Sequence, residues 1–402
     1  MIVPEIPAAI LALPEQTPAL SAQLEAWANI NSGSDHATGL EHMGAELEAA
    51  FAALPGAQVD RPELPGALCR AVRVRMRPAA PYQILLSGHF DTVYGEDHPF
   101  QVCARPDADT LRGPGVADMK GGLVVMHAAL AAFEQLPGAA NLGWEVLLTP
   151  DEETGSLASA PLLIETAGRH DFGLVFEPAR PGGELVRSRM GVGRFTVSCS
   201  GRAAHAAKVP NDGRNAIVAL ADFVVAVSRL PAELPGLLVN AGSIRGGSEA
   251  TNVVPDFSEV VFDVRVTDAA GQAAIQQRLH DLAAARTRDG INFTLSGGLN
   301  RPPKECGPVE ETAFAAWQQA GADLKLTPFT WVHSGGGSDG NFLSAASLPN
   351  LDGVGVIGDH LHSDRECCRV ASLAERAQLA ALFLSRVAAG EVVLPVRKRS
   401  VA

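Results

Sequence analysis

Short, continuously apolar segments alternate with longer helix-like segments in the first half of the chain, and this alternation strongly limits the possible folds. Strands that are apolar along their whole length are typical of a parallel sheet covered on both faces. The sequence therefore predicts an α/β domain with a mostly parallel central sheet. Its predicted strands are 82–93, 144–150 and 172–178, and its predicted helices are 119–136, opened by a glycine-rich turn, and 157–168.

The pattern changes near residue 189, where apolar and polar residues begin to alternate with a period of two. This period predicts a strand with one buried face over 192–201. The elements predicted after it are a helix (213–230), two strands (237–246 and 259–266), a helix (270–286) and a strand (291–297). The order β-α-β-β-α-β is that of a ferredoxin-like unit. We therefore expect an inserted α+β domain at 189–301, between two segments of the α/β domain at 1–188 and 302–402.

Composition and charge exclude several classes of partner. The formal net charge of −13 argues against nucleic acid or an anionic membrane. No apolar run reaches the roughly 18–20 residues that span a bilayer, and the first residues lack the basic region of a secretory signal. The six cysteines show no zinc-finger spacing and are expected to be reduced thiols. These features predict a soluble, cytoplasmic protein.

Histidines and carboxylates gather where the predicted strands end. In an open α/β sheet, ligands bind outside the carboxyl ends of the strands. Unpaired carboxylates there would repel one another and would be costly to bury, so something positive must meet them. A set of His, Asp and Glu suits zinc or a related divalent ion. The residues concerned are His89, Asp91, Asp118, Glu152, Glu153, Glu177, His360, His362 and Glu366.

Each of these signals has an ordinary structural alternative when taken alone. A strand-end histidine is more often structural than a ligand, an aspartate before a helix is usually an N-cap, and a Glu-Glu pair is usually a solvated turn. The glycine-rich segment 113–122 lacks the spacing of a phosphate-binding loop, and no G-x-S-x-G motif supports serine catalysis. The convergence of two histidines and four carboxylates on successive strand ends favours the metal site.

Four motifs resemble those of the dizinc metallopeptidases and deacylases. They are SGHFDTV (87–93), GPGVADMKGG (113–122), DEETGS (151–156) and GGGSDGNF (335–342). This family includes glutamate carboxypeptidase, acetylornithine deacetylase, succinyl-diaminopimelate desuccinylase and aminoacylase. The resemblance extends from about residue 80 to 370 and includes the inserted domain. Through 200–217 and the HSDRE segment (362–366), the chain is most similar to the glutamate carboxypeptidase type.

The resemblance implies two divalent metal ions, zinc first and cobalt or manganese as alternatives. Asp118 would bridge them, His89 and Glu177 would complete one site, and Glu153 and His362 the other. The family pattern of His, a small hydroxyl residue, two variable positions and Glu favours His362 over His360. The sequence departs from the family at Cys367, where an aromatic residue is usual.

The resemblance also implies roles for residues that do not bind metal. Glu152 would be the general base for a water shared by the two metals, and Asp91 would orient His89. A cis peptide bond is implied between Asp118 and Met119. Adjacent Glu152 and Glu153 can divide these tasks because neighbouring side chains point in different directions.

The inserted domain carries a second set of candidate residues. By resemblance, His205 would reach the active site of a partner subunit in a homodimer and bind the developing oxyanion. Arg189, Asn252 and Arg265 resemble residues that hold the carboxylate of the substrate, which Arg can capture in bidentate fashion. The alternatives are that His205 packs in a loop, that Asn252 shapes a turn, and that Arg265 pairs with Asp263 at the surface.

The predicted function is hydrolysis of an amide bond in a peptidyl or N-acyl amino acid with a free carboxylate. A glutamate carboxypeptidase and an N-acyl amino acid deacylase, such as an aminoacylase, both remain compatible with the motifs. A relative that only binds a ligand should have lost Asp118, Glu152 or His362, and the chain retains all three.

Overall fold

The computed structural model describes residues 5–208 and 212–397. Residues 209–211, which belong to the motif around His205, and residues 1–4 of the apolar start lie outside this description. The contacts between residues divide the chain into two compact units. The first unit contains the chain up to Ser188, Cys306–His333, and the chain from Ser338 onward. The second unit contains Arg189–Glu305 and Ser334–Gly337.

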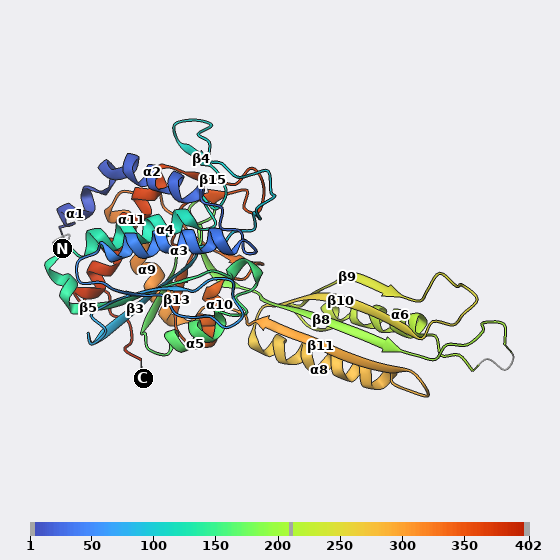
Figure 1. The fold of residues 1–402 in the computed structure, drawn as a ribbon. Coiled ribbons are helices and arrows are strands. Elements are labelled where there is room, and N and C mark those ends of the chain that lie inside the picture. Colours follow the sequence, from blue (N-terminus) through green and yellow to red (C-terminus); the bar gives the residue numbers. More distant parts are fainter. Residues whose placement is uncertain (1–4, 209–211, 398–402) are drawn as a thin grey trace. The chain divides into compact units, whose positions relative to one another are not determined.

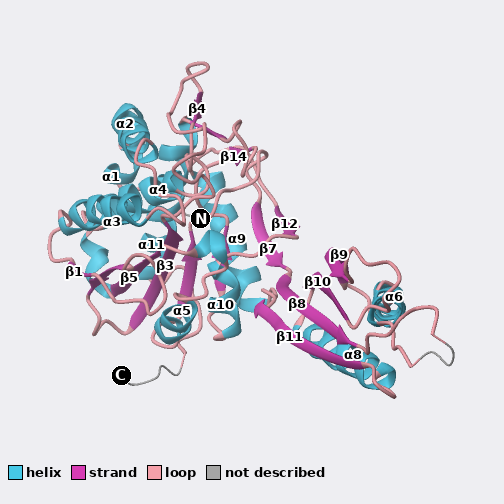
Figure 2. Cartoon of the chain, turned by 45° about the vertical axis from the view of Figure 1, so that its right-hand side comes forward, coloured by secondary structure: helices cyan, strands magenta, loops and turns pink. Residues whose placement is uncertain are grey.

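The first unit is built on an eight-stranded mixed sheet (Figures 1 and 2). Strands β5, β3, β6 and β13 are parallel to one another and form its centre, whereas β2 and β7 flank them in the antiparallel direction. This confirms the predicted, mostly parallel central sheet. The strand order is β1 (Gln58–Asp60), β2 (Val72–Met76), β5 (Leu142–Thr149), β3 (Tyr82–His89), β6 (Phe172–Val175), β13 (Asn350–Asp352), β7 (Leu185–Arg189) and β12 (Trp331–Ser334).

Helices cover both faces of this sheet. Trp144, Val146 and Leu148 of β5 pack into the large core on one face, and Leu147 packs into the smaller core on the other. All eight residues of β5 are buried, as expected for a strand covered on both sides. The large core includes residues of α2 (Thr17–Ala28), α3 (Ala37–Ala52), α4 (Lys120–Phe133), α9 (Pro308–Asp323) and α11 (Ala371–Ala388). The smaller core includes residues of α5 (Ala160–Ala167) and α10 (Asp339–Ala345).

Short elements complete the first unit. Strand β15 pairs with β14 and β4 in a small antiparallel sheet. The remaining elements are α1 (Ala8–Leu11), η1 (Leu13–Gln16), β4 (Thr110–Arg112), η2 (Pro137–Asn141), η3 (Glu152–Thr154), β14 (Gly358–Asp359) and β15 (Cys367–Arg369).

The second unit is an antiparallel sheet with two long helices packed on one face. Burial alternates along β8 and β10, as the period of two in the sequence predicts. The strand order is β11 (Asn292–Arg301), β8 (Gly191–Ser200), β10 (Phe257–Val266) and β9 (Leu238–Gly246). With α6 (Ala216–Val227) and α8 (Ala269–Arg286), it forms the predicted β-α-β-β-α-β unit. The structure adds a short helix, α7 (Leu230–Glu233), between α6 and β9.

The two glycines at the start of the predicted helix 119–136 lie in the first turn of α4. Helix α4 begins at Lys120, and these glycines are Gly121 and Gly122. A Cβ on Gly121 would lie 2.3 Å from the carbonyl oxygen of Val116, and one on Gly122 would lie 2.0 Å from that of Phe176. These glycines are therefore explained by the close approach of neighbouring backbone.

Within the described residues, no helix is long and apolar enough to cross a membrane. All six cysteines are free, in agreement with the expectation of reduced thiols.

Candidate metal centre

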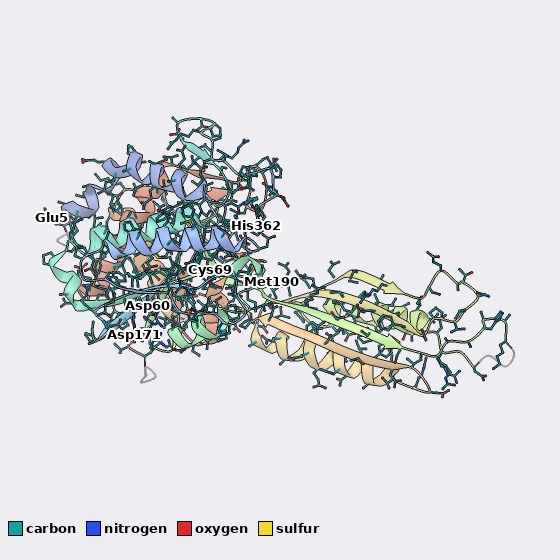
Figure 3. All side chains as sticks on the ribbon, viewed as in Figure 1. Glu5, Asp60, Cys69, Asp171, Met190 and His362 are labelled. Carbon is teal, nitrogen blue, oxygen red and sulfur yellow. The ribbon has the colours of Figure 1, made fainter. Side chains whose placement is uncertain are left out.

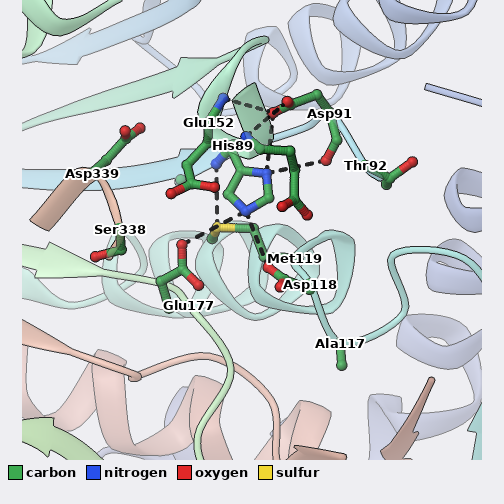
Figure 4. A network of polar contacts seen from close by, with 12 residues as sticks. His89, Asp91, Thr92, Ala117, Asp118, Met119, Glu152, Glu177, Ser338 and Asp339 are labelled. Atoms are coloured by element: carbon green, nitrogen blue, oxygen red, sulfur yellow. Dashed lines mark hydrogen bonds and ion pairs between the residues drawn. The ribbon is translucent and has the colours of Figure 1, made fainter. Parts of the chain in front are cut away.

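The candidate metal ligands of the first unit come from segments that end at one edge of its sheet. Because β3, β5 and β6 are parallel, their carboxyl ends meet there. His89 is the last residue of β3, Glu153 lies in η3 just beyond β5, and Glu177 closely follows β6. Asp118 precedes α4, and His362 follows β14. The topology thus gathers residues that are distant in sequence. Figure 4 shows His89, Asp118 and Glu177 close together, and Figure 3 marks His362 in the first unit.

Asp118 lies between the two histidines. Its Oδ1 is 3.1 Å from His89 Nε2, and its Oδ2 is 3.2 Å from His362 Nε2. On the first side, His89 Nε2 is also 3.6 Å from Glu177 Oε1. On the second side, His362 Nε2 is 3.2 Å from Glu153 Oε2. The two oxygens of one buried carboxylate therefore face two separate pairs of ligand atoms.

The electrostatics of the cluster favour positive charge. Hydrogen bonds to Asp118 and Glu153 raise the pKa of His362 to about 11. Burial lowers the pKa of His89, but its contacts with Asp118 and Asp91 outweigh burial and raise that pKa well above its ordinary value. Burial, together with the nearby charge of Asp118, raises the pKa of Glu153. The carboxylates thus stabilise cations at the positions of both imidazole rings.

The donor set fits a divalent metal ion. Ligand atoms of His89, Asp118 and Glu153 all lie within 4.8 Å of one another. Glu153 Oε1 is buried and has no hydrogen-bond partner among the described residues, although a buried carboxylate oxygen ordinarily has one. Imidazole nitrogen and carboxylate oxygen are the donors that zinc and related ions take.

Glu152 lies beside the first half of the cluster. Its carboxylate forms a second group of ligand atoms with His89 and Glu177, also within 4.8 Å of one another. The side chain is buried and is carried by the short helix η3. This position suits either a general base or a further ligand, and the experiment on Glu152 in the Discussion distinguishes the two.

Asp91 has more contacts than sequence reasoning assigned to it. Its Oδ1 lies 3.3 Å from His89 Nδ1, which fits the expected orienting role. Its two oxygens also accept the backbone N–H groups of Glu152 and Glu153, each at 3.1 Å (Figure 4). Asp91 therefore holds both the imidazole of His89 and the turn that carries the two glutamates. The start of a short helix just after β5 was the available signal, since its free N–H groups need an acceptor.

Asp339 was part of a recognised motif but had no predicted role. It is buried, and its carboxylate accepts hydrogen bonds from Thr149 Oγ1 at 2.8 Å and Ser156 Oγ at 2.5 Å. Thr149 ends β5 before the turn that carries Glu152 and Glu153, and Ser156 follows that turn. Asp339, at the start of α10, therefore holds both ends of the turn.

The structure distinguishes the two candidate histidines by their neighbours. His362 points to Asp118 and Glu153, whereas His360 Nε2 lies 3.8 Å from Asp359 Oδ2. The peptide bond between Asp118 and Met119 is cis, which confirms the expectation drawn from the family resemblance.

The candidate residues of the second unit lie at opposite ends of its sheet. Arg265 pairs with Val192 across β10 and β8, near the end where Arg189 enters the unit. At the other end, His205 follows β8 and Asn252 precedes β10. The two segments meet there, because the backbone N–H of Ala206 donates to the carbonyl oxygen of Asn252 at 2.9 Å. The unit thus groups these four residues as two separate pairs.

The two arginines also differ in their contacts. Arg189 is buried and donates from Nη1 to the carbonyl oxygens of Gly336 and Gly337, at 3.3 and 3.2 Å. Arg265 pairs with Asp263 at 3.1 Å, which is the predicted alternative for this residue. It also donates to the carbonyl oxygen of Gly335 at 2.8 Å.

Comparison with known proteins places the chain in a family. Residues 85–386 match the model of peptidase family M20/M25/M40. Carboxypeptidase G2 of Pseudomonas sp. is 28% identical over 385 residues, which cover 94% of this chain and 91% of that protein. A succinyl-diaminopimelate desuccinylase of Methylobacterium radiotolerans is 31% identical over 283 residues, which cover 65% of this chain and 69% of that protein.

Solved structures agree in fold. A tripeptidase of Staphylococcus aureus superposes with a TM-score of 0.75 at 22% identity, covering 93% of this chain and 99% of that one. A metallo-carboxypeptidase of the M20 family from Sulfolobus solfataricus superposes with a TM-score of 0.72 at 15% identity, covering 91% and 98%. The chain therefore belongs to peptidase family M20/M25/M40, a family of metal-dependent hydrolases.

Proposed function

We propose that this protein is a two-metal hydrolase that cleaves the amide bond of a peptidyl or N-acyl amino acid with a free carboxylate. The observation that carries the proposal is the position of Asp118, whose two oxygens face His89 and His362 separately. A carboxylate in this position can bridge two cations. The relatives named carboxypeptidase and desuccinylase support amide hydrolysis as the reaction.

The contacts support one set of ligands for each ion. His89, Glu177 and Oδ1 of Asp118 would hold one ion, and Glu153, His362 and Oδ2 of Asp118 the other. Such a pair of ions, when bound, polarises the carbonyl group of the substrate and lowers the pKa of a water ligand toward about 7.

Glu152 supplies the proton transfers in this proposal. Its carboxylate accepts a proton from the attacking water and then delivers it to the nitrogen of the leaving amine. Asp91 keeps Glu152 in place by accepting its backbone N–H at 3.1 Å. General-base catalysis of this kind contributes roughly 10²–10⁴-fold to the rate.

Arg265 is the better of the two arginine candidates for the substrate carboxylate. Its side chain is 35% exposed, so its guanidinium can exchange the contact with Asp263 for a bidentate contact with a ligand. The burial of Arg189 and its bonds to two glycine carbonyls support a role in holding the segment Ser334–Gly337.

An N-acyl amino acid deacylase is the second candidate function. The desuccinylase relative, at 31% identity, favours it, whereas the carboxypeptidase relative covers more of the chain, 94% against 65%. Both reactions break a bond between a carbonyl carbon and an amide nitrogen near a carboxylate. They differ in the group attached to the carbonyl.

A hydrolysis screen tests the proposal. Metal-depleted protein is reloaded with zinc, cobalt or manganese and supplied with dipeptides and N-acyl amino acids. Each substrate is paired with an analogue whose carboxylate is replaced by a carboxamide. We expect metal-dependent cleavage of the carboxylates and at least tenfold weaker cleavage of the carboxamides, since a neutral carboxamide cannot form the bidentate, charge-assisted contact with Arg265. Equal cleavage of both members of the pairs, or cleavage without metal, contradicts the proposal.

A further inference from the structure

Tyr94 and Glu366 are buried polar residues that have no role in the proposed chemistry. Tyr94 is 3% exposed and Glu366 is fully buried. Tyr94 follows β3 on the loop beyond His89, and Glu366 precedes β15. Their side chains meet, with Tyr94 Oη 2.7 Å from Glu366 Oε2. A buried carboxylate needs several hydrogen bonds to offset its loss of hydration, so its partners indicate what it holds in place.

Glu366 holds the backbone at Asp118. Its Oε1 accepts the N–H groups of Ala117 and Asp118, at 2.9 and 3.0 Å. Its own carbonyl oxygen accepts the N–H of Gly113 at 3.2 Å. Glu366 therefore contacts the loop before α4 at both of its ends.

Tyr94 holds the backbone next to His362. Its hydroxyl lies 2.8 Å from the carbonyl oxygen of Ser363, the residue that follows His362. The aromatic ring packs edge-on against Phe100 and His98, with ring centroids 5.2 and 5.1 Å away. The ring is thus fixed on its own loop, and the hydroxyl reaches across to the loop of His362.

We propose that Tyr94 and Glu366 are positioning residues that hold Asp118 and His362 at the spacing needed to bind one metal ion together. The inference rests on the proposed function, because it takes Asp118 and His362 as ligands. Both belong to loops. The ladder between β4 and β15 pairs Arg112 with Cys367, several residues away from either ligand. The contacts of Tyr94 and Glu366 connect the loops closer to the ligands. Removing outer partners of metal ligands typically costs 10–100-fold in metal affinity.

The hydrogen atoms of the pair allow a sharp test with a conservative variant. A tyrosine hydroxyl has one hydrogen, yet Tyr94 Oη lies within 2.8 Å of two oxygens, on Ser363 and Glu366. A glutamine at position 366 would satisfy every contact. Its amide oxygen would accept the two backbone N–H groups, and its amide nitrogen would donate to Tyr94 Oη. The hydroxyl of Tyr94 would then donate to Ser363.

The experiment measures metal affinity in four variants. Metal-depleted wild type, Tyr94→Phe, Glu366→Ala, Glu366→Gln and Tyr82→Phe are titrated with Co²⁺ and followed by calorimetry and by the visible absorption of cobalt. Tyr82 is the only other tyrosine and begins β3 at the end opposite His89, so Tyr82→Phe makes the same chemical change away from the site. Unfolding of each metal-free variant is recorded in parallel.

We expect Tyr94→Phe to weaken one of two bound ions by about 10–100-fold and Glu366→Ala to weaken both, since Asp118 bridges them. Glu366→Gln and Tyr82→Phe should bind as the wild type does. Excess metal should restore kcat in Tyr94→Phe, which distinguishes lost affinity from lost chemistry. Wild-type affinity in Tyr94→Phe, or equal losses in Glu366→Gln and Glu366→Ala, would overturn the inference. If Glu366→Ala does not fold, Tyr94→Phe alone decides. A wild type that binds fewer than two ions overturns the proposed function instead.

Discussion

Glu152 and Glu153 show how two identical neighbours can differ in role. Glu153 Oε2 lies 3.2 Å from His362 Nε2, on the second side of Asp118. The carboxylate of Glu152 lies instead on the first side of Asp118, near the ligand atoms of His89 and Glu177. The short helix η3 separates the two side chains because successive residues of a helix project in different directions.

The first prediction concerns the individual residues Glu152 and Glu153. Glu152→Gln should lower kcat by roughly 10²–10⁴-fold and leave metal content unchanged, because an amide cannot accept the proton. Glu153→Ala should lose one metal ion. Turnover and elemental analysis are measured on the same samples, with Glu165→Gln on the exposed surface of α5 as the control. Loss of metal in Glu152→Gln would identify Glu152 as a ligand, and retention of more than about a tenth of kcat would exclude it as the base.

Glu145 is a buried acid that is not among the candidate metal ligands. It lies on β5, with His170 Nε2 and Arg169 Nη2 each 3.5 Å from its carboxylate oxygens. Burial raises the pKa of Glu145 above its ordinary value, and the nearby arginines only partly offset this. The unfolded chain therefore releases this proton at a lower pH than the folded chain. The contribution of Glu145 to stability is complete below its ordinary pKa of 4.5 and declines as pH rises through its raised pKa.

A second prediction follows for pH dependence. Glu145→Gln removes this titration, so the free energy of unfolding of the variant should increase relative to that of wild type as pH rises from 4 to 7. Urea unfolding of metal-free protein at several pH values measures the difference. Glu165→Gln changes a 68% exposed acid that pairs with the same Arg169, so it should show almost no such trend. A trend of opposite sign in Glu145→Gln contradicts the assignment.

At the scale of elements, the contact of α4 with the segment that follows β6 depends on the lack of a side chain at Gly122. A Cβ there would lie 2.0 Å from the carbonyl oxygen of Phe176, the residue just before Glu177. Helix propensity alone would favour alanine over glycine by about 1 kcal/mol. The steric contact is with backbone, which cannot rotate away as a flexible side chain can. Packing therefore outweighs propensity at this position.

The third prediction contrasts two glycines. Gly122→Ala should lower the free energy of unfolding by about 1–3 kcal/mol, as overpacking does, and should reduce metal affinity by displacing Glu177. Gly138→Ala in η2 is the control, because no atom lies within 4 Å of the added Cβ. Denaturant unfolding and metal titration measure both effects. A Gly122→Ala protein as stable as Gly138→Ala would show that α4 and the backbone of Phe176 are not packed this closely.

At the scale of the whole molecule, the second unit contains two pairs of candidate residues far apart. At about 3.3 Å per residue, the ten residues of β10 span about 30 Å between the end near Arg265 and the end near Asn252. One substrate of amino-acid size cannot touch both ends. A second copy of the chain could supply His205 and Asn252 to a substrate held by Arg265, which supports the proposed homodimer.

The surface of the second unit is consistent with such a partner. Strand β9 is an edge strand, and its Leu238 and Ile244 are exposed. Ile217 and Val218 on α6 are exposed as well. An unpaired edge and exposed apolar side chains are the features that tend to be covered in an assembly.

The fourth prediction tests this proposal by complementation. Glu152→Ala and His205→Ala proteins, each of which we expect to be inactive alone, are mixed under conditions that exchange subunits. If His205 acts on the partner's site, each heterodimer contains one site with both defects and one with neither, so activity should return. Exchange is verified by native mass spectrometry with differently tagged chains. Verified exchange without activity excludes a contribution of His205 in trans, and a monomer in solution excludes the dimer.

The sequence predicted the central strands and helices and indicated a metal for the site. Apolar segments such as 144–150 predict a buried strand because a strand buried on both faces needs apolar residues along its whole length. The alternation in 192–201 predicts a half-buried strand for the same reason. The types of residue at the strand ends indicate a metal because few other partners suit a cluster of His, Asp and Glu. These are local properties, and a local pattern preserves them.

Which groups hold one another depends on the folded structure. That Asp91 accepts the N–H groups of Glu152 and Glu153, and that Glu366 does the same for Ala117 and Asp118, depends on contacts between distant segments. The need for a glycine at position 122 was not predictable, because its close neighbour, Phe176, is remote in sequence. Hydrogen bonds and steric contacts act over a few ångströms in space whatever the separation along the chain. Only the folded backbone brings such partners within that range.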